Sequence, residues 1–385
     1  MSKHDFTTIE FAERLARVRI AMAAQDLDWL IAVHPVSIHW LTGSDAKSYQ
    51  EFQCLLVGGH GEPLVVLTRQ GEVHEFETDS LADEVHGFGG GENEDPVVAF
   101  AGLARHHGLL GKRVSLEVPA YYLHPHHYLA LRALLGDGLV AEPTELIADL
   151  KLVKSPAELA YIRRAAALAD LGMARFTRDL SAGISELALA GGVTETVMAN
   201  GSGFAASPIN LVSGPRSAYS HGAPTERQLR QNDFGSIEFG TSCRRYTATI
   251  GRQFALGSPT ARMLELYNVV RRACDAMIAT IGDGVPATVP HEAARAIIGQ
   301  AGLEPHRVHT SGYGLGPGFP PSWAEPLHMI GGSPHVLRAG MVVTVEPPVF
   351  VGPESLGARI IDNVLVTSTG AELLARAPRD LIVVD

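Results

Sequence analysis

The stretch Asn232–Phe254, NDFGSIEFGTSCRRYTATIGRQF, decides the fold class of this chain. It contains two short runs rich in apolar, β-branched and aromatic residues, a pattern typical of strands that are close together in the sequence. Four runs of this kind occur in the chain: Phe234–Phe239, Arg245–Phe254, Met341–Phe350 and Arg359–Thr367. A helical pattern over Arg262–Ile281 separates the first pair from the second. Strands and helices are therefore grouped, which predicts an α+β domain.

A new helical pattern begins at residues 154–158, KSPAE, and marks a domain boundary. Ser155 is suited to an N-cap, and Pro156 to the first position of a helix. Glu158 completes a capping box before the long helical pattern that follows. We place the boundary just before this helix, so the expected domains are residues 1–152 and 153–385.

The first 152 residues predict a smaller α/β domain. Residues 9–25 carry apolar side chains at a spacing of three to four, which is typical of an amphipathic helix. Residues 29–33 resemble a buried strand, and residues 54–57 and 64–68 flank the Gly-rich loop of a hairpin. A further strand is expected at residues 113–118, with a helix after it. Helices and strands alternate here, which favours an α/β layer arrangement.

Composition narrows the class of protein. Hydrophobic residues make up 46% of the 385 residues, which excludes a disordered chain. The formal net charge is −11, and a net-acidic chain without a basic cluster is a poor binder of nucleic acid or anionic membrane. Three widely spaced cysteines favour neither a disulfide framework nor a cysteine zinc site. With no signal-peptide pattern and no long apolar run, we expect a cytoplasmic protein without a membrane span.

Six segments resemble the pita-bread-fold family that includes creatinase, prolidase, aminopeptidase P and methionine aminopeptidase. They lie in the family's order, at residues 152–170, 221–224, 232–254, 309–316, 337–350 and 357–374. The resemblance implies a C-terminal pita-bread domain. It also implies that the N-terminal domain is similar to the smaller domain of creatinase and prolidase.

The resemblance further implies five metal-ligand positions, which in the family's peptidases carry two Asp, one His and two Glu. In this chain those positions hold Glu238, Thr249, Tyr313, Glu346 and Ile361. Two hard cations about 3.5–4 Å apart need several carboxylate or imidazole donors, and only two of these five residues are carboxylates. Asp362 is expected to face the opposite side of its strand from Ile361. We therefore expect no functional metal pair and no other cofactor.

Other residues resemble the metal-free branch of the family, ectoine hydrolase and creatinase. The matching features are Glu238, the pair Arg244-Arg245 before Tyr246, and the tract from Phe319 to Trp323. Glu346 is more similar to the creatinase and peptidase pattern. This resemblance implies a metal-independent hydrolase of a C–N bond in a small zwitterionic amidine, guanidine or amide.

Three residues are the expected catalytic groups. Glu238, on an apolar strand, is expected to be a nucleophile or an anchor for a cationic substrate, or else a carboxylate paired with Arg245 or Arg252. Glu346 would be a second carboxylate near the first, which favours a cation between them or a proton on one of them. His221, in the sequence Ser-His-Gly-Ala-Pro, is suited to proton transfer near neutral pH.

A second group is expected to bind the substrate: Tyr313, His309, Arg245, Tyr246, Trp323 and Arg252. Arg245 and Arg252 can hold a carboxylate with two hydrogen bonds, although for Arg252 an internal ion pair is the favoured interpretation. Trp323 offers an aromatic face to a cation. Tyr313 can donate a hydrogen bond or fill the space that a metal would take.

Two other functions stay open. One is a metal-dependent Xaa-Pro aminopeptidase or prolidase, against which the five-position comparison argues. The other is a non-catalytic binder of small molecules with the same fold. Glu238 and His221 together argue against a binder, because binding needs no proton transfer. The resemblance also implies a homodimer.

Overall fold

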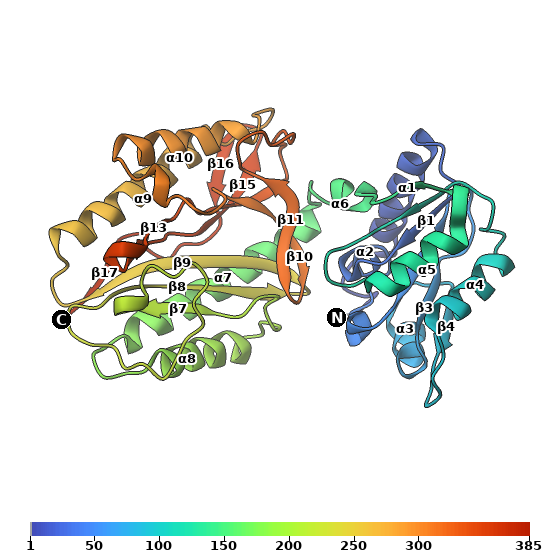
Figure 1. Cartoon of the computed structure of the whole chain (residues 1–385), viewed down its shortest axis with the longest axis horizontal. Helices are drawn as coiled ribbons and strands as arrows, with labels where there is room; N and C mark the ends of the chain where they lie inside the picture. The colour runs from blue at the N-terminus through green and yellow to red at the C-terminus, as the bar shows by residue number, and fades with distance from the viewer. Residues whose placement is uncertain (1) are drawn as a thin grey trace. The chain divides into compact units, whose positions relative to one another are not determined.

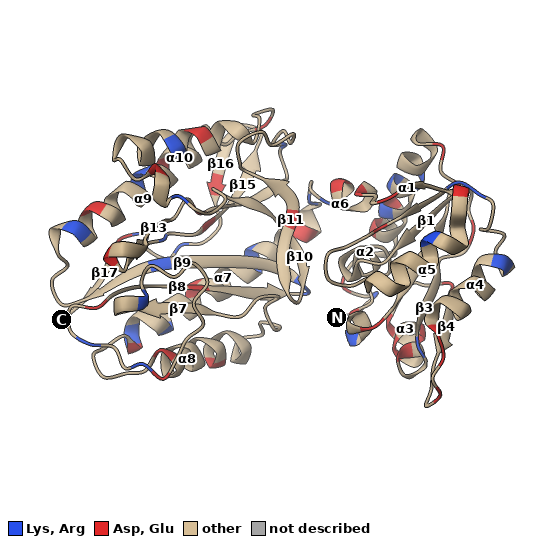
Figure 2. Ribbon diagram, in the orientation of Figure 1, with Lys and Arg blue, Asp and Glu red and all other residues tan. Residues whose placement is uncertain are grey.

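The computed structural model (Figure 1) describes residues 2–385 and divides the chain into two compact units, Met1–Leu150 and Lys151–Asp385. Each unit has hydrophobic clusters of its own. Acidic and basic residues are interspersed along the helices of both units (Figure 2). Among the described residues, no helix combines the length and the apolar character that crossing a membrane requires.

The first unit is built on a six-stranded sheet in the order β4-β3-β2-β1-β5-β6. Its strands are β1 (Trp29–Ala32), β2 (Cys54–Gly58), β3 (Val65–Arg69), β4 (Glu84–Phe88), β5 (Val114–Leu116) and β6 (Leu139–Ala141). Its helices are α1 (Thr8–Ala24), α2 (Pro35–Thr42), α3 (Val73–Asp79), α4 (Pro96–His106), α5 (Pro125–Leu135) and α6 (Leu146–Leu150). The β2–β3 pair is antiparallel, as expected for the hairpin.

Both faces of this sheet are covered, as an α/β arrangement requires. Along β1, Leu30 and Ile31 belong to different hydrophobic clusters, because successive side chains of a strand point to opposite faces. The cluster of Ile31 includes Phe100 of α4 and residues of α5. The cluster of Leu30 includes Val18 of α1 and residues of α2 and α3. Helices therefore pack on each side of the sheet.

The second unit is α+β, as predicted, and centres on a nine-stranded sheet with the path β16-β15-β12-β10-β9-β8-β7, in which β11 also pairs with β10 and β17 with β9. Its strands are β7 (Asn210–Ser213), β8 (Phe234–Cys243), β9 (Tyr246–Leu256), β10 (Tyr313–Phe319), β11 (Ser322–His328), β12 (Val342–Val345), β13 (Val349–Val351), β14 (Leu356–Ala358), β15 (Asp362–Thr367), β16 (Gly370–Leu373) and β17 (Ile382–Val384). Its helices are α7 (Pro156–Asp179), α8 (Glu186–Ala199), α9 (Ala261–Thr280) and α10 (Thr288–Gln300).

The helices of the second unit cover different strands. Residues of α7 and α8 share one hydrophobic cluster with β8 and β9. Residues of α9 and α10 share another with β12 and β15, and Figure 1 shows the two helix pairs on opposite sides of the long β8–β9 hairpin. The helix α7 begins at the expected capping box: Ser155 Oγ accepts from Glu158 N at 3.2 Å, and Glu158 Oε2 accepts from Ser155 N at 2.7 Å.

Two expected strands are shorter than their apolar runs. The run Met341–Phe350 forms two strands, β12 and β13, separated by the residues Glu346-Pro347-Pro348. Proline cannot donate to a strand ladder, so the ladder stops at this point. The strand β15 begins at Asp362 rather than at Arg359. Both interruptions place a charged residue, Glu346 or Arg359, at a strand end.

Candidate active site

A small hollow in the second unit gathers most of the polar residues expected at a site. Its lining consists of His221, Glu238, His309, Tyr313, Glu346, Pro348, Arg359 and Ile361. The structure thus brings together the three residues expected to be catalytic and two of those expected to bind the substrate. We call this hollow the carboxylate pocket.

Glu238 lies in the middle of β8, between Asn210 of β7 and Gly251 of β9. It is almost fully buried, and its Oε2 accepts from the guanidinium of Arg359 and, at 3.0 Å, from Asn210 Nδ2. The second amino group of Arg359 donates to the backbone carbonyl of Ser220. These donors stabilise a charged Glu238, because a buried carboxylate needs partners of this kind. The ion-pair partner is Arg359, and not Arg245 or Arg252.

Glu346 directly follows β12 and is also buried, but it has far fewer partners. Its Oε1 lies 3.5 Å from His309 Nδ1, and its Oε2 has no hydrogen-bond partner. Burial, and then the nearby charge of Glu238, raise the pKa of Glu346 well above its ordinary value. The two carboxyl groups therefore lie in different environments: Glu238 is paired with a guanidinium, whereas the raised pKa of Glu346 favours its protonated form. Such a pair can act as acid and base in one reaction.

Two histidines connect this pair to solvent. Burial lowers the pKa of His309, so its imidazole is neutral at neutral pH. The ring of His309 lies 5.4 Å from the ring of His221, whose side chain is exposed. His309 thus contacts both the buried Glu346 and a histidine at the surface, an arrangement that can move protons between the pocket and water.

Tyr313 offers a hydrogen-bond donor to the pocket from the first residue of β10. Burial, together with the charges of Glu346 and Glu238, raises its pKa well above the ordinary value, so the phenol keeps its proton. Its oxygen accepts from Trp323 Nε1 at 2.9 Å, which fixes the direction of the O–H group. A Cβ at Gly240 would lie 2.6 Å from the Trp323 ring, so glycine there leaves room for the indole. Trp323 supports Tyr313 and is not part of the lining.

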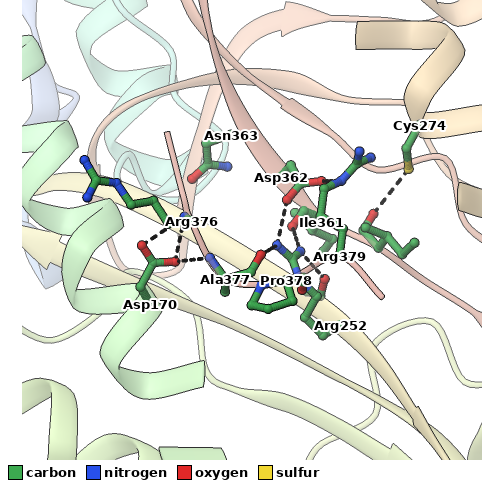
Figure 3. Close-up of polar contacts among 12 residues, drawn as sticks. Asp170, Arg252, Cys274, Ile361, Asp362, Asn363, Arg376, Ala377, Pro378 and Arg379 are labelled. Carbon is green, nitrogen blue, oxygen red and sulfur yellow. Dashed lines mark hydrogen bonds and ion pairs between the residues drawn. The ribbon is translucent and has the colours of Figure 1, made fainter. Parts of the chain in front are cut away.

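Arg252 is placed outside the carboxylate pocket, in a buried ion network (Figure 3). Its Nη2 donates to Asp362 Oδ1 at 2.9 Å, and its Nη1 donates to the carbonyl of Ile361 at 2.8 Å. Asp362 Oδ2 also accepts from Arg379 Nε at 2.6 Å. Asp362 is fully engaged on this side of the sheet, while Ile361 lines the pocket. The network holds β9 against the residues before β15.

Tyr246 and Arg245 are also placed away from the pocket lining. The hydroxyl of Tyr246 donates to Glu158 Oε1 at 2.7 Å, which ties β9 to the start of α7. Arg244 and Arg245 form the two-residue turn between β8 and β9, with φ of +54° and +67°. Positive φ at both turn residues matches the twist of a β-hairpin. The guanidinium of Arg245 lies 4.2 Å from the centre of the Phe319 ring.

The residues at the five ligand positions do not fit the pair of cations implied by the family resemblance. The hydroxyl of Thr249 is bonded to the Phe239 carbonyl at 3.3 Å, and that of Tyr313 is engaged by Trp323. Ile361 contributes an apolar side chain. A fixed guanidinium already neutralises the carboxylate of Glu238. Two bridged cations need more oxygen or imidazole donors than this set supplies.

The fold defines a class: a two-domain protein with a C-terminal pita-bread domain. The chain belongs to metallopeptidase family M24, whose model matches residues 160–368. The creatinase/prolidase N-terminal domain matches residues 14–153. The resemblance to the creatinase, prolidase and aminopeptidase P proteins is thereby confirmed.

Relatives of this chain carry peptidase names. The chain is 29% identical to the "Probable dipeptidase PepE" of Mycobacterium tuberculosis, over 100% of this chain and 99% of the relative. It is 31% identical to the "Xaa-Pro dipeptidase" of Pyrococcus furiosus over 48% of this chain and 51% of that one. The crystal structure of dipeptidase PepE from Mycobacterium ulcerans superposes with a TM-score of 0.86, at 27% identity and 98% and 99% coverage.

These comparisons overturn the expected function. The expectation of a metal-independent, ectoine-hydrolase-like enzyme for amidines or guanidines is wrong, because the family is one of metallopeptidases and the relatives are named dipeptidases. The peptidase alternative is the better supported one. The error has a physical source: the five-position comparison concerns which groups can hold a cation, and it does not determine which bond is cut.

Sequence reasoning missed Arg359 and Asn210. Arg359 is 121 residues from Glu238 in the chain, whereas Arg245 and Arg252 are its near neighbours. A signal was present, because a carboxylate on an apolar strand requires a cationic or hydrogen-bonding partner. Arg359, near the start of the segment 357–374, was a candidate for that partner.

Proposed function

We propose that this chain is a dipeptidase-like hydrolase that cleaves the amide bond of short peptides, with Xaa-Pro dipeptides as the first substrates to test. The observation that carries the proposal is the unequal carboxyl pair: Glu346 has one oxygen without a hydrogen-bond partner among the described residues, and Glu238 is paired with Arg359. The peptidase names of the full-length relatives support the substrate class.

The pocket contains the groups that amide hydrolysis needs. Glu238 accepts a proton from the attacking water, and the protonated Glu346 donates its proton to the carbonyl oxygen of the scissile amide. The Tyr313 hydroxyl donates a hydrogen bond to the same developing oxyanion. His309 and His221 relay the proton taken up by Glu238 to the departing nitrogen, and the C–N bond breaks. The hydroxyl formed from the carbonyl oxygen returns its proton to Glu346 as the amine and the new carboxylic acid leave. Each proton thus passes between named atoms and solvent.

A panel of Xaa-Pro and ordinary dipeptides, assayed for amine release, tests the proposal. The assay uses the full chain after chelator treatment and again with added Mn²⁺, Co²⁺ or Zn²⁺. We expect hydrolysis in at least one condition, and its loss in Glu346→Gln. Glu195→Gln, an exposed acid on α8, is the matched control. Dipeptide binding without turnover under every condition would favour the non-catalytic binder and overturn the proposal.

We further infer from the family resemblance that the chain forms a homodimer. Sedimentation velocity at micromolar concentration tests this inference directly. The expected mass is twice the 41.1 kDa of one chain. A single species with the mass of one chain would contradict the inference.

A further inference from the structure

Three side chains of the first unit converge at the edge of its sheet, outside the residues already discussed. Glu84 and His86 lie two residues apart on the edge strand β4, so both point to the same face. His107 is the C-cap residue of α4. One potential metal-binding atom from each residue lies within 4.8 Å of the other two.

The distances between these atoms match the edges of a tetrahedral zinc site. Glu84 Oε2 lies 3.2 Å from His86 Nε2 and 3.3 Å from His107 Nε2. Ligand atoms about 2.0–2.1 Å from a tetrahedral zinc ion lie about 3.3 Å from one another. Two of the three edges of one face of such a tetrahedron therefore have the required length. The two ring nitrogens, which lie within 4.8 Å of each other, form the third edge when a bound ion draws them together.

His107 is the strongest sign that these residues bind a ligand. Its side chain is 9% exposed, and its Nε2 has no hydrogen-bond partner. The ring is held by edge contacts with Trp29, at 6.3 Å, and with His106, at 4.9 Å. A buried ring nitrogen without a partner costs free energy, and this one is aimed at the oxygen of Glu84. A bound cation would satisfy it.

We propose that Glu84, His86 and His107 bind one Zn²⁺ ion in the N-terminal unit. Two imidazoles and one carboxylate form a known zinc donor set in which the fourth position is left to water. Glu84 and His86 are 37% and 41% exposed, so solvent reaches that position. The ion would fasten the edge strand β4 to the end of α4. This site belongs to the first unit and shares no residue with the carboxylate pocket.

Zinc titration of the full chain against a chromogenic chelator tests the proposal. We expect one tightly bound ion, and at least about a tenfold loss of affinity in both Glu84→Gln and His86→Ala. His106→Ala is the matched control, because His106 adjoins His107 and is not a proposed ligand; it should keep the wild-type affinity. The double variant His221→Ala/His309→Ala should also keep it, which separates this ion from any bound in the pocket.

A thermal unfolding scan gives a second readout that does not depend on catalysis. Zinc should raise the unfolding midpoint of the wild type and of His106→Ala, and leave that of His86→Ala unchanged. His86 is half-exposed, so its truncation should leave the metal-free fold intact, which circular dichroism checks. Unchanged zinc affinity in Glu84→Gln and His86→Ala, or loss confined to the pocket double variant, would overturn the proposal.

Discussion

Glu238 and Arg359 form a buried ion pair that joins the centre of β8 to the residue after β14. The pair gives the Glu238 carboxylate a cationic partner, while Glu346, in the same pocket, has no guanidinium beside it and has a raised pKa. This difference in environment underlies the acid and base roles proposed for the two groups. The predictions below follow from it and from the contacts that support it.

Removal of Arg359 should lower the stability of the folded chain. In Arg359→Ala the carboxylate of Glu238 stays buried without its ionic partner, which should lower the free energy of unfolding by about 3–5 kcal/mol. Urea denaturation measures the loss. Arg272→Ala, at a surface position of α9, serves as the control and should change stability by less than about 0.5 kcal/mol. A change of similar small size in Arg359→Ala would contradict the pairing.

Glu346 should make stability depend on pH in a defined direction. Its pKa in the folded chain is raised above that in the unfolded chain, so the native state binds the proton more tightly. Stability is therefore greatest below the unfolded pKa and decreases as pH rises toward and through the folded pKa. Glu346→Gln, which cannot ionise, should gain more in unfolding temperature over wild type at pH 8 than at pH 4. An equal difference at both pH values would count against a raised pKa.

The rate of hydrolysis should depend on the protonation of Glu346 and His309. Activity should fall on the alkaline side as Glu346 loses its proton, and on the acid side as His309, whose pKa is lowered, gains one. A pH–rate profile of the wild type checks this shape. In His309→Gln the acid limb should shift or disappear. If the acid limb is unchanged in His309→Gln, the group that titrates in this limb is not His309.

Asp362 should act on stability rather than on substrate binding. It accepts from both Arg252 and Arg379 (Figure 3), and it is not among the residues that line the carboxylate pocket. Asp362→Ala leaves buried guanidinium charge uncompensated, which should cost about 3–5 kcal/mol. The KM of the remaining folded enzyme should stay close to that of the wild type. A large rise in KM with unchanged stability would place Asp362 in the binding site instead. Asp380→Ala, at an exposed acid near Arg271, is the control.

Trp323 should affect the rate through Tyr313. Trp323→Phe keeps the packing of a ring and removes the hydrogen bond from Nε1 to the Tyr313 hydroxyl. The change should cost about 1–2 kcal/mol in stability and lower kcat more than it raises KM, because Tyr313 loses its fixed orientation. Steady-state kinetics on a dipeptide substrate separates the two effects. A change in KM alone would indicate that Trp323 binds the substrate directly.

Local signals in the sequence predicted much of the fold. The capping box at Ser155 and Glu158 and the paired runs of Asn232–Phe254 depend on neighbouring residues, and the structure contains both. The break between β12 and β13 was also readable in principle, because Glu346 is followed by two prolines. Contacts between segments that are distant in the sequence could not be predicted from local signals. These contacts determine which residues line the carboxylate pocket. The pairing of Glu238 with Arg359 depends on how the sheet folds over a separation of 121 residues.

The measurement that tests the central claim most directly is dipeptide turnover by the wild type and by Glu346→Gln at neutral pH, under the metal conditions given above. The account predicts amine release by the wild type and at least about a hundredfold lower kcat in Glu346→Gln, with the fold retained, because a general acid contributes about 10²–10⁴-fold. Equal turnover by both proteins would contradict the role of Glu346. Absence of turnover by the wild type on every dipeptide would contradict the assignment as a peptidase.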